Sequence, residues 1–453
     1  MFKSLQDALE SKNKCSSKYK MNFVGGKTKL ITMIKIRLTI IIIFAGLGLS
    51  AQEMPFRIKG EGLSMKSLLS QRALLKKYLG DEKHVMLGEP THGDGSIMEY
   101  KVQLIKELHE KHGFDVILFE SDMLGLHIAS TIEHEGIGEV INKTLPSMWK
   151  NSTEFQELVS YIDQQNKSGD SLFIGGFDSQ LTQSSIRHFN STLPIFFKNN
   201  NIVLSKEIGW NELDEHRNFF SALVLLINKA FTKNPTLISK VDIKRFEGTL
   251  RMLIEESVKV NSNDGKIWAQ ALKNVSDYLP LLYKNNQLPY SSSVAEISLR
   301  DSVMANNYIF QANSIFNGKK IVSWAATDHI RRNFKHEKAK KMGQHLNEKL
   351  RRPPYVVGFT AGEGTYYNYL DKKVYPIPNS ERGSFEEFAK HSNKEDFFLN
   401  LKSEKNSTDK EPSNLSISMR PLGYYPISAN WALALDAIIY VDFARASSVK
   451  DKE

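Results

Sequence analysis

Short apolar runs rich in β-branched residues alternate along the chain with longer segments of helical periodicity. Such runs predict buried strands, and they occur at 84–87, 115–119, 172–175, 320–324, 355–359 and 437–441. Between the first two runs, apolar residues recur at three- and four-residue spacing, as in an amphipathic helix: Met98, Val102, Ile105 and Leu108. A strand, a helix and a second strand within about 35 residues favour a parallel sheet. The predicted fold class is therefore α/β, with a mainly parallel central sheet flanked by helices.

One long segment lacks strand signals. Between Leu193 and Ala312 the apolar residues follow helical spacing, as in 219–231 and 243–258. We therefore predict an all-helical insertion or subdomain over approximately 195–312, within one α/β domain that spans 52–453. A polar stretch at 403–415 is predicted to be a loop.

The first 51 residues have the pattern of a secretory leader. Lys35 and Arg37 precede an apolar run at 38–49, and small residues lead to a plausible cleavage point after Ala51. The pattern predicts a signal peptide within 1–51, with Met33 as the true start. A permanent N-terminal anchor is the weaker alternative, because a membrane-spanning helix needs about 20 apolar residues. The expected location is the periplasm or the outside of the cell, with no permanent membrane span after cleavage.

The net charge belongs mainly to this leader. The whole chain carries +9, and residues 1–51, with nine basic and two acidic side chains, account for +7 of it. The remainder is close to neutral, so composition gives no support for a nucleic-acid partner. The single cysteine, Cys15, also precedes the predicted start. We therefore expect no disulfide, thiolate nucleophile or Cys-liganded zinc in the mature protein.

Ionisable residues follow four of the predicted strands. Parallel sheets bind ligands beyond the carboxyl ends of their strands, and the residues found there are Glu89, His92, Glu120, Asp178, Asp328 and His329. A histidine beside a carboxylate can take a proton from water, because its pKa lies near neutrality and the acid stabilises the imidazolium. Two histidines with a carboxylate could alternatively hold a catalytic zinc ion. The sequence contains neither G-x-S-x-G nor H-E-x-x-H, so it lacks two common hydrolase motifs.

The residues after the first strand resemble a family motif. Gly88-Glu89-Pro90-Thr91-His92-Gly93 matches the G-E-x-T-H-G pattern of the erythromycin esterase family. Further matching segments follow in the family's order, so that the resemblance covers about 65–445: Glu99 and Lys101, Phe119-Glu120, Trp149-Lys150-Asn151 with Glu154, Gly176-Phe177-Asp178, Arg300-Asp301, Trp324 to Ile330, and Ala434 to Asp442.

The resemblance implies an α/β core with a helical portion, and hydrolysis of a macrolide lactone by water that a histidine activates. Carried over by motif, His92 is the general base, and Glu89 and Glu120 orient or tune it. Lys101 either polarises the ester carbonyl or pairs with a carboxylate, and His329 lines the pocket. The remaining matches imply substrate-binding positions at Asp328, Trp149, Asp178 and Arg300. No cofactor and no metal are implied, and the expected partner is a small-molecule ester or lactone.

Two departures from the family pattern bear on the substrate. Where the family has W-A-H-N-x-H, this chain has Ala326 and Thr327 in place of the first His and the Asn. After the motif, Asp94-Gly95-Ser96 replaces the commoner T-R-E. Hydrolysis remains possible with these changes, but macrolide specificity does not follow from the motif.

Three hypotheses follow. The leading one is an exported hydrolase that opens an ester or macrolide lactone, with a role in antibiotic resistance. The second is a metal-dependent hydrolase that uses His92, His329, Glu89 and Glu120. The third is a non-catalytic member that binds a small molecule or polysaccharide outside the membrane, which the missing pocket histidine favours.

Overall fold

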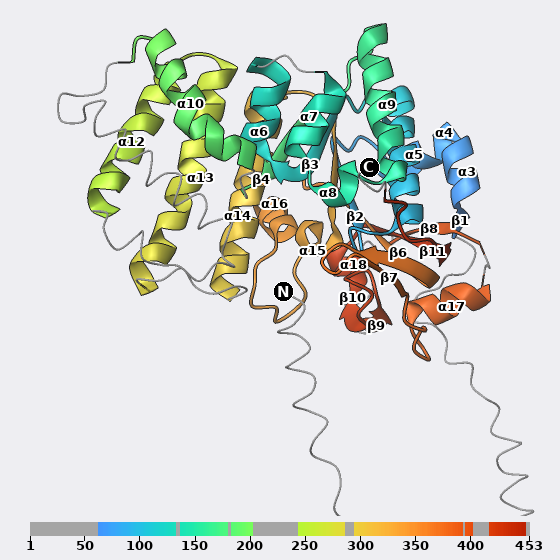
Figure 1. Ribbon diagram of the computed structural model, residues 1–453. Helices are drawn as coiled ribbons and strands as arrows, with labels where there is room; N and C mark the ends of the chain where they lie inside the picture. Colours follow the sequence, from blue (N-terminus) through green and yellow to red (C-terminus); the bar gives the residue numbers. More distant parts are fainter. Residues whose placement is uncertain are drawn as a thin grey trace, which may run out of the picture. The chain divides into compact units, whose positions relative to one another are not determined.

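Strands and helices alternate along most of the computed structural model (Figure 1), which describes residues 62–132, 136–179, 183–202, 243–285, 294–392, 395–401 and 416–449. All of them belong to one structural unit, Lys59–Glu453. The predicted leader, with Met33, Cys15 and the cleavage point after Ala51, lies outside the described residues. The same holds for the predicted loop at 403–415 and for the predicted helix at 219–231.

A nine-stranded sheet forms the centre of this unit, in the order β1-β8-β11-β6-β2-β5-β3-β4, with β7 paired to β6. Neighbours from β11 to β4 are parallel. These six parallel strands are β2 (His84–Glu89), β3 (Val116–Asp122), β4 (Phe173–Asp178), β5 (Ile321–Ala326), β6 (Tyr355–Asn368) and β11 (Ala437–Ala444). Each coincides with one of the predicted apolar runs to within one residue at its start, so the predicted fold class is confirmed.

The remaining strands are short and antiparallel, and sequence periodicity did not predict them. Three of them join the central sheet: β1 (Leu63–Ser64), β7 (Lys373–Pro376) and β8 (Phe397–Asn400). The other two, β9 (Ser416–Met419) and β10 (Ile427–Asn430), pair with each other. Elements of two to four residues are too short for a two-residue alternation to stand out from chance.

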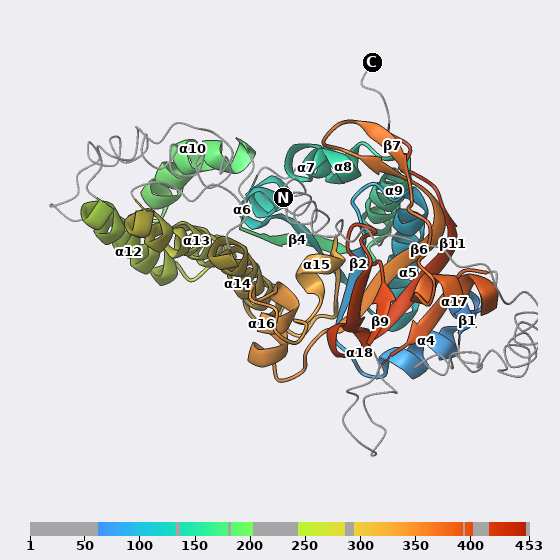
Figure 2. The same ribbon diagram turned by 90° about the horizontal axis from the view of Figure 1, so that it is seen from below.

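One face of the sheet is covered by a helix that follows β2. This helix, α5 (Gly95–His112), contains the predicted amphipathic pattern and contacts β2, β5 and β11. It packs against α9 (Thr153–Ser168), and in Figure 2 both lie at the right, at the end of the sheet that holds β6 and β11 rather than β4. Of the neighbouring helices, α3 (Met65–Ser70) contacts α5 and the following α4 (Arg72–Leu79), and α7 (Ile137–Thr144) and α8 (Ser147–Lys150) contact α9. The short α6 (Met123–His127) packs instead against β4.

The described residues between 183 and 315 are helical. They form α10 (Gln183–Asn199), α12 (Ile243–Lys259), α13 (Asn263–Asn285), α14 (Val294–Phe310) and the π-helical turn η3 (Gln311–Ile315). A separate apolar core, which includes the buried Trp268, joins them to α6 and to a second π-helical turn, η1 (Ile128–Ile132). The boundaries of a helical subdomain stay a prediction. Short helices complete the chain at α15 (Thr327–Ile330), α16 (Met342–Lys349), α17 (Phe385–Ser392) and α18 (Trp431–Ala434).

Aromatic side chains pack between the sheet and the layer of α5 and α9. The Trp324 ring of β5 lies edge-on to Phe155 of α9 at 5.1 Å and to Trp149 of α8 at 6.2 Å. These side chains are fully buried and exclude water beneath the carboxyl ends of β2 and β5. Across the described ranges, we find no helix that combines the length and apolarity needed to cross a membrane.

Candidate active site

The carboxyl ends of four neighbouring strands carry the predicted site residues. The register pairs Glu89 of β2 with Ala326 of β5, and Asp122 of β3 with Asp178 of β4. Because parallel strands end at one edge of a sheet, residues distant in sequence meet there. Their side chains form two neighbouring groups, one around Glu89 and one around Arg300.

The first group is centred on the buried Glu89 carboxylate. Oε1 of Glu89 lies 3.0 Å from Nδ1 of His92 and accepts from Nε1 of Trp149 at 3.2 Å. Oε2 of Glu89 accepts from the Lys101 ammonium, which reaches it from α5. The His92 ring is edge-on to Trp149 and 31% exposed. Among the hydrogen bonds found in the described part of the chain, His92 uses Nδ1 and none involves its Nε2.

Electrostatics keep this group ionic at neutral pH. Burial favours the protonated acid, but Lys101 and His92 outweigh it and hold the pKa of Glu89 below its ordinary value. Burial lowers the pKa of Lys101 to about 8, against the opposing effect of Glu89. The ammonium lies 4.1 Å from the centre of the Trp324 ring and donates to the Ala325 carbonyl at 3.3 Å. Because Lys101 has no exposed surface, the geometry favours pairing with Glu89 over contact with a substrate.

A tight loop between β2 and α5 presents His92. Gly93 has no room for a side chain, because a Cβ there would lie 1.8 Å from the Tyr367 carbonyl oxygen. Its own carbonyl accepts from the backbone N–H groups of Tyr367 at 3.0 Å and Ser447 at 2.8 Å. The loop is thus held by β6 and by the segment after β11, two parts of the chain far away in sequence.

Asp94 is a buried carboxyl in this loop that the sequence motif did not identify as functional. Its Oδ1 accepts from the Tyr424 hydroxyl at 2.7 Å, and its Oδ2 accepts from the Thr91 hydroxyl at 2.8 Å and the Thr91 N–H at 3.1 Å. Burial raises the pKa of Asp94 to about 7, although these three hydrogen bonds oppose the shift. The one signal for Asp94 in the sequence was its position, because it stands where this chain departs from the family pattern.

The second group surrounds Arg300 of α14. Its guanidinium holds Asp178 through two hydrogen bonds, of 3.2 and 2.7 Å, and contacts Oε1 of Glu120 at 3.3 Å. Burial opposes the charge, but Asp178 and Glu120 raise the pKa of Arg300 further above its ordinary value. Asp301, the next residue of α14, binds Nδ1 of His329 at 2.5 Å. We did not identify Asp301 as a site residue from sequence, although it adjoins Arg300 in the matching segment.

The proton on Nε2 of His329 decides which partner this nitrogen binds. Without it, Nε2 accepts from Nη1 of Arg300 at 3.2 Å, and with it, Nε2 faces Oε1 of Glu120 at 3.4 Å. Burial lowers the pKa of His329, but Asp301 and Glu120 outweigh burial and raise it above the ordinary value. The second group can therefore hold a proton at the carboxyl edge of the sheet.

The two groups meet where β2 and β5 end. The N–H of Ala326 donates to Oε2 of Glu120 at 2.9 Å, and the Thr327 hydroxyl donates to the Gly88 carbonyl at 2.5 Å. A Cβ at Gly88 would lie 2.7 Å from the Thr327 backbone. The two positions that depart from the family pattern thus join the strand ends through a backbone N–H and a hydroxyl.

Two of the predicted substrate-binding residues, Asp328 and Trp149, are held by other side chains of the protein. Asp328 pairs with Arg331 at 2.8 Å and with Lys341 at 2.6 Å, and none of the hydrogen bonds found in the described ranges joins it to the two groups. Burial opposes the Asp328 charge, but these cations hold its pKa well below the ordinary range. Trp149 is fully buried and touches Glu89. Substrate contact by either residue stays a prediction.

The donor set does not fit the metal-dependent hypothesis. Among the described residues, no three His, Cys, Asp or Glu side chains are arranged to hold a metal ion. Cations of the chain itself, Lys101 and Arg300, already lie against the carboxylates of Glu89 and Glu120. A divalent ion would have to displace these resident charges.

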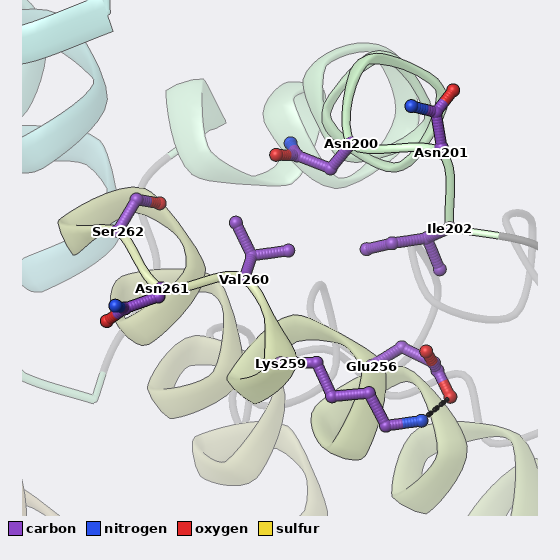
Figure 3. A pocket seen from close by; sticks show the side chains of 8 residues that line it. All are labelled: Asn200, Asn201, Ile202, Glu256, Lys259, Val260, Asn261 and Ser262. Carbon is purple, nitrogen blue, oxygen red and sulfur yellow. Dashed lines mark hydrogen bonds and ion pairs between the residues drawn. The ribbon is translucent and has the colours of Figure 1, made fainter.

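Two cavities lie away from the strand ends. One, of about 630 Å³, is bordered by the end of α10 and the turn between α12 and α13. Figure 3 shows Asn200 and Asn201 on one side and the Lys259–Glu256 ion pair on the other. The second, of about 450 Å³, lies at the start of β4. None of the predicted site residues lines either cavity.

The carboxyl edge of a parallel sheet is where α/β proteins bind ligands, and a histidine held by a carboxylate there can act in general acid–base catalysis. The erythromycin esterase family model matches residues 109–443, and the chain belongs to this family. The match begins after the loop that carries His92, so the motif at Gly88–Gly93 is additional to it. In Bacillus subtilis (strain 168), the protein named "Putative hydrolase YbfO" is 28% identical over 73% of this chain and 77% of its own length. Together these matches support a hydrolase.

Solved structures share the fold. A succinoglycan biosynthesis protein superposes with a TM-score of 0.63 at 19% identity, covering 85% of this chain and 98% of the other. The erythromycin esterase EreC, as a variant in its open conformation, superposes with a TM-score of 0.58 at 16% identity, covering 86% and 100%. At these identities the likeness concerns the fold alone.

Proposed function

We propose that the protein hydrolyses a carboxylic ester or lactone, with a water molecule activated by His92. The observation that carries the proposal is the His92–Glu89 pair, in which the buried acid holds Nδ1 while Nε2 is left for a reactant. Family membership supports the reaction class, and macrolide lactones are one candidate substrate.

The chemistry assigns the proton on Nδ1 to the hydrogen bond with Glu89, so that Nε2 is the base. Nε2 takes a proton from water as the water oxygen attacks the ester carbonyl carbon, and a tetrahedral oxyanion forms. Glu89 stabilises the resulting imidazolium, and Lys101 keeps Glu89 ionised. When the carbon–oxygen bond breaks, the imidazolium returns the proton to the leaving alkoxide.

The second group would stabilise the charge that develops on the carbonyl oxygen. The Arg300 guanidinium of α14 and a protonated His329 lie together at the carboxyl edge of the sheet, where their positive charges are fixed beside Glu120. Fixed donors of this kind contribute most in sites that exclude water. Asp178 and Asp301 would hold these two donors in place.

The test is turnover of a panel of macrolides and simple esters, with product masses as the readout. Replacing His92 with Ala should lower turnover by at least about 10³-fold while leaving the unfolding midpoint unchanged, because the ring is partly exposed. Turnover retained in the folded variant would refute the assignment.

The same panel tests a non-catalytic role. Position 326 carries Ala where the family pattern has His, and only its backbone N–H contacts the site. The site therefore has one imidazole fewer than the family pattern, which is the observation in favour of a non-catalytic role. Binding of a panel member with no change in its mass would support that role, and any turnover that depends on His92 would exclude it.

We also propose that the chain is exported. The support is the basic, apolar and small-residue sequence of the leader, which ends at Ala51. On this proposal the substrate is met outside the cytoplasm.

A further inference from the structure

We propose that a basic strip formed by residues 331–352 binds the anionic headgroups of a phospholipid surface. The strip comprises the loop after α15, helix α16 and the residues that follow it. It holds nine Lys and Arg side chains and two Glu, a net charge of +7, whereas the whole predicted mature chain carries +2. The positive charge is thus concentrated in this one segment. Binding by this surface does not depend on the hydrolase proposal.

More than half of these cations are left to face solvent. Four of the nine have an acidic partner: Arg331, Arg332, Lys340 and Lys341. The other five are exposed and take part in none of the ion pairs found in the described ranges: Lys335, Lys338, Lys349, Arg351 and Arg352. One of the five, Lys349, donates to the neutral amide of Asn306 at 2.7 Å. These five charges are available to an anionic partner.

The loop and α16 are fastened to each other, so that their cations share one surface. The Asn333 side chain donates to the Ala339 carbonyl at 2.8 Å and accepts from the Lys341 N–H at 2.8 Å, which closes the loop around 334–338. Lys340 then pairs with Glu348 in the last turn of α16. The helix itself packs against α14 and α15 (Figure 1). The loop cations therefore adjoin those at the end of α16.

The local potential is positive even with the acids of the strip in place. Burial lowers the pKa of Lys349, and the charges of Lys340 and Lys273 lower it further. Burial lowers the pKa of His345 too, and Lys340 and Lys349 add to the shift. At both positions the neighbouring cations outweigh the neighbouring acids. A surface with such a potential attracts anions.

An exposed leucine borders the strip and favours a lipid surface over a soluble polyanion. Leu433 of α18 is 46% exposed, and its carbonyl accepts from Nε of Arg332 at 2.7 Å. Phe334 of the loop packs edge-on against Trp431 of the same helix, with the ring centres 4.9 Å apart. Cations beside an exposed apolar side chain suit a membrane interface, where the cations meet anionic headgroups and the apolar group enters the acyl boundary.

The test is binding of the full chain to vesicles of phosphatidylglycerol mixed with phosphatidylcholine, measured by co-sedimentation. Lys335→Gln combined with Lys338→Gln should lower the partition coefficient about 30-fold, since each cation near an anionic surface contributes about fivefold. Arg351→Gln combined with Arg352→Gln should have the same effect. All four side chains are exposed, so we expect both double variants to fold.

The matched control is Lys66→Gln combined with Lys76→Gln, which removes the same charge from exposed positions on α3 and α4. It should lower binding by about twofold at most, because charges outside the contact are screened by salt. Acetylation by a water-soluble reagent locates the contact independently of the leader, which every form contains. Bound vesicles should protect Lys335 and Lys338 and leave Lys66 and Lys76 reactive.

Leu433 distinguishes a lipid surface from a soluble polyanion. Leu433→Ser should weaken vesicle binding about fivefold, because roughly half a leucine side chain no longer enters the acyl boundary, and it should leave binding to dextran sulfate unchanged. Binding to dextran sulfate without binding to the vesicles would overturn the choice of a lipid surface. Unchanged vesicle binding in both double variants, or vesicles that leave Lys335 and Lys338 reactive, would overturn the strip itself.

Discussion

At the scale of single residues, the site depends on how burial and charge are matched. Glu89 and Lys101 are both buried, and each offsets the desolvation of the other. Breaking such a pair is costly, because the remaining charge is buried alone, whereas removing both charges need not be. Single and double substitutions of the pair can therefore distinguish its effect on stability from its role in the chemistry.

We expect Lys101→Met to lower the free energy of unfolding by about 3 kcal/mol and to move the acidic limb of the pH–rate profile to higher pH. Lys101 holds the pKa of Glu89 down, so its loss raises that pKa, and Glu89 becomes ionised only at higher pH. The profile is measured as kcat/KM against pH.

The matched control is Glu89→Gln combined with Lys101→Met. This double variant should recover most of the lost stability, since no unpaired charge remains buried, yet it should stay inactive. Recovery of activity in the double variant would show that the Glu89 charge has no part in catalysis.

The buried Asp94 should make the protein less stable as pH rises, whereas an ordinary salt-bridged acid makes it more stable. Its folded pKa is raised to about 7 from an ordinary 3.8, so its contribution is fully present below about pH 4 and is lost as pH rises toward 7. The loss is on the order of 4 kcal/mol. Asp94→Asn can keep all three hydrogen bonds, with its amide oxygen toward Thr91 and its nitrogen toward Tyr424.

The measurement is the free energy of unfolding of wild type and Asp94→Asn from pH 4 to 8. Relative to wild type, Asp94→Asn should become more stable as pH rises through this range. Parallel curves would show that Asp94 does not titrate there.

At the scale of elements, the loop that carries His92 is positioned by parts of the chain that follow it by more than 250 residues. Gly93 packs on the backbone of Tyr367, and Ser447 donates to its carbonyl. The amphipathic pattern of α5 and the apolar run of β2 predicted both flanking elements. Periodicity could not predict what holds the loop between them, because its partners are backbone atoms that carry no residue-specific signal.

Gly93→Ala should therefore lower kcat by about 10²-fold or more, because a Cβ there meets the Tyr367 carbonyl oxygen and the loop must shift. Gly138→Ala in α7 is the control, since a Cβ there meets nothing within 4 Å; a helical Gly-to-Ala change is neutral or stabilising. Full activity in Gly93→Ala would mean that the loop can move without displacing His92.

At the scale of the whole molecule, the described core and its hydrogen bonds lie between residues 62 and 449. The predicted mature chain, which begins at Gln52, contains all of them. The helical segment between β4 and β5 supplies Arg300 and Asp301 to the active-site edge and Gln311 to the cavity at the start of β4. One helical segment thus contributes to both ends of β4.

A chain that starts at Gln52 should unfold within about 2 °C of the full-length protein, because no described contact is removed. Calorimetry of the two forms provides the comparison. The export proposal is tested separately by the intact mass of the protein recovered outside the cytoplasm, which should correspond to cleavage after Ala51. Recovery of the full-length mass there would refute cleavage.

The sequence by itself determined the six parallel strands and the α5 helix, because apolar periodicity is a local property of the chain. It also determined that five site residues lie at one edge of the sheet, because parallel strands end at the same edge: Glu89, His92, Glu120, Asp178 and His329. Only the tertiary structure decided the partners: Lys101 with Glu89, Asp301 with His329, and Tyr424 with Asp94. It also decided that Asp328 pairs with Arg331 and Lys341. Such pairings depend on the distance between side chains and on their burial after folding, which residue type and spacing do not encode, even where the partners are as near in sequence as Asp328 and Arg331.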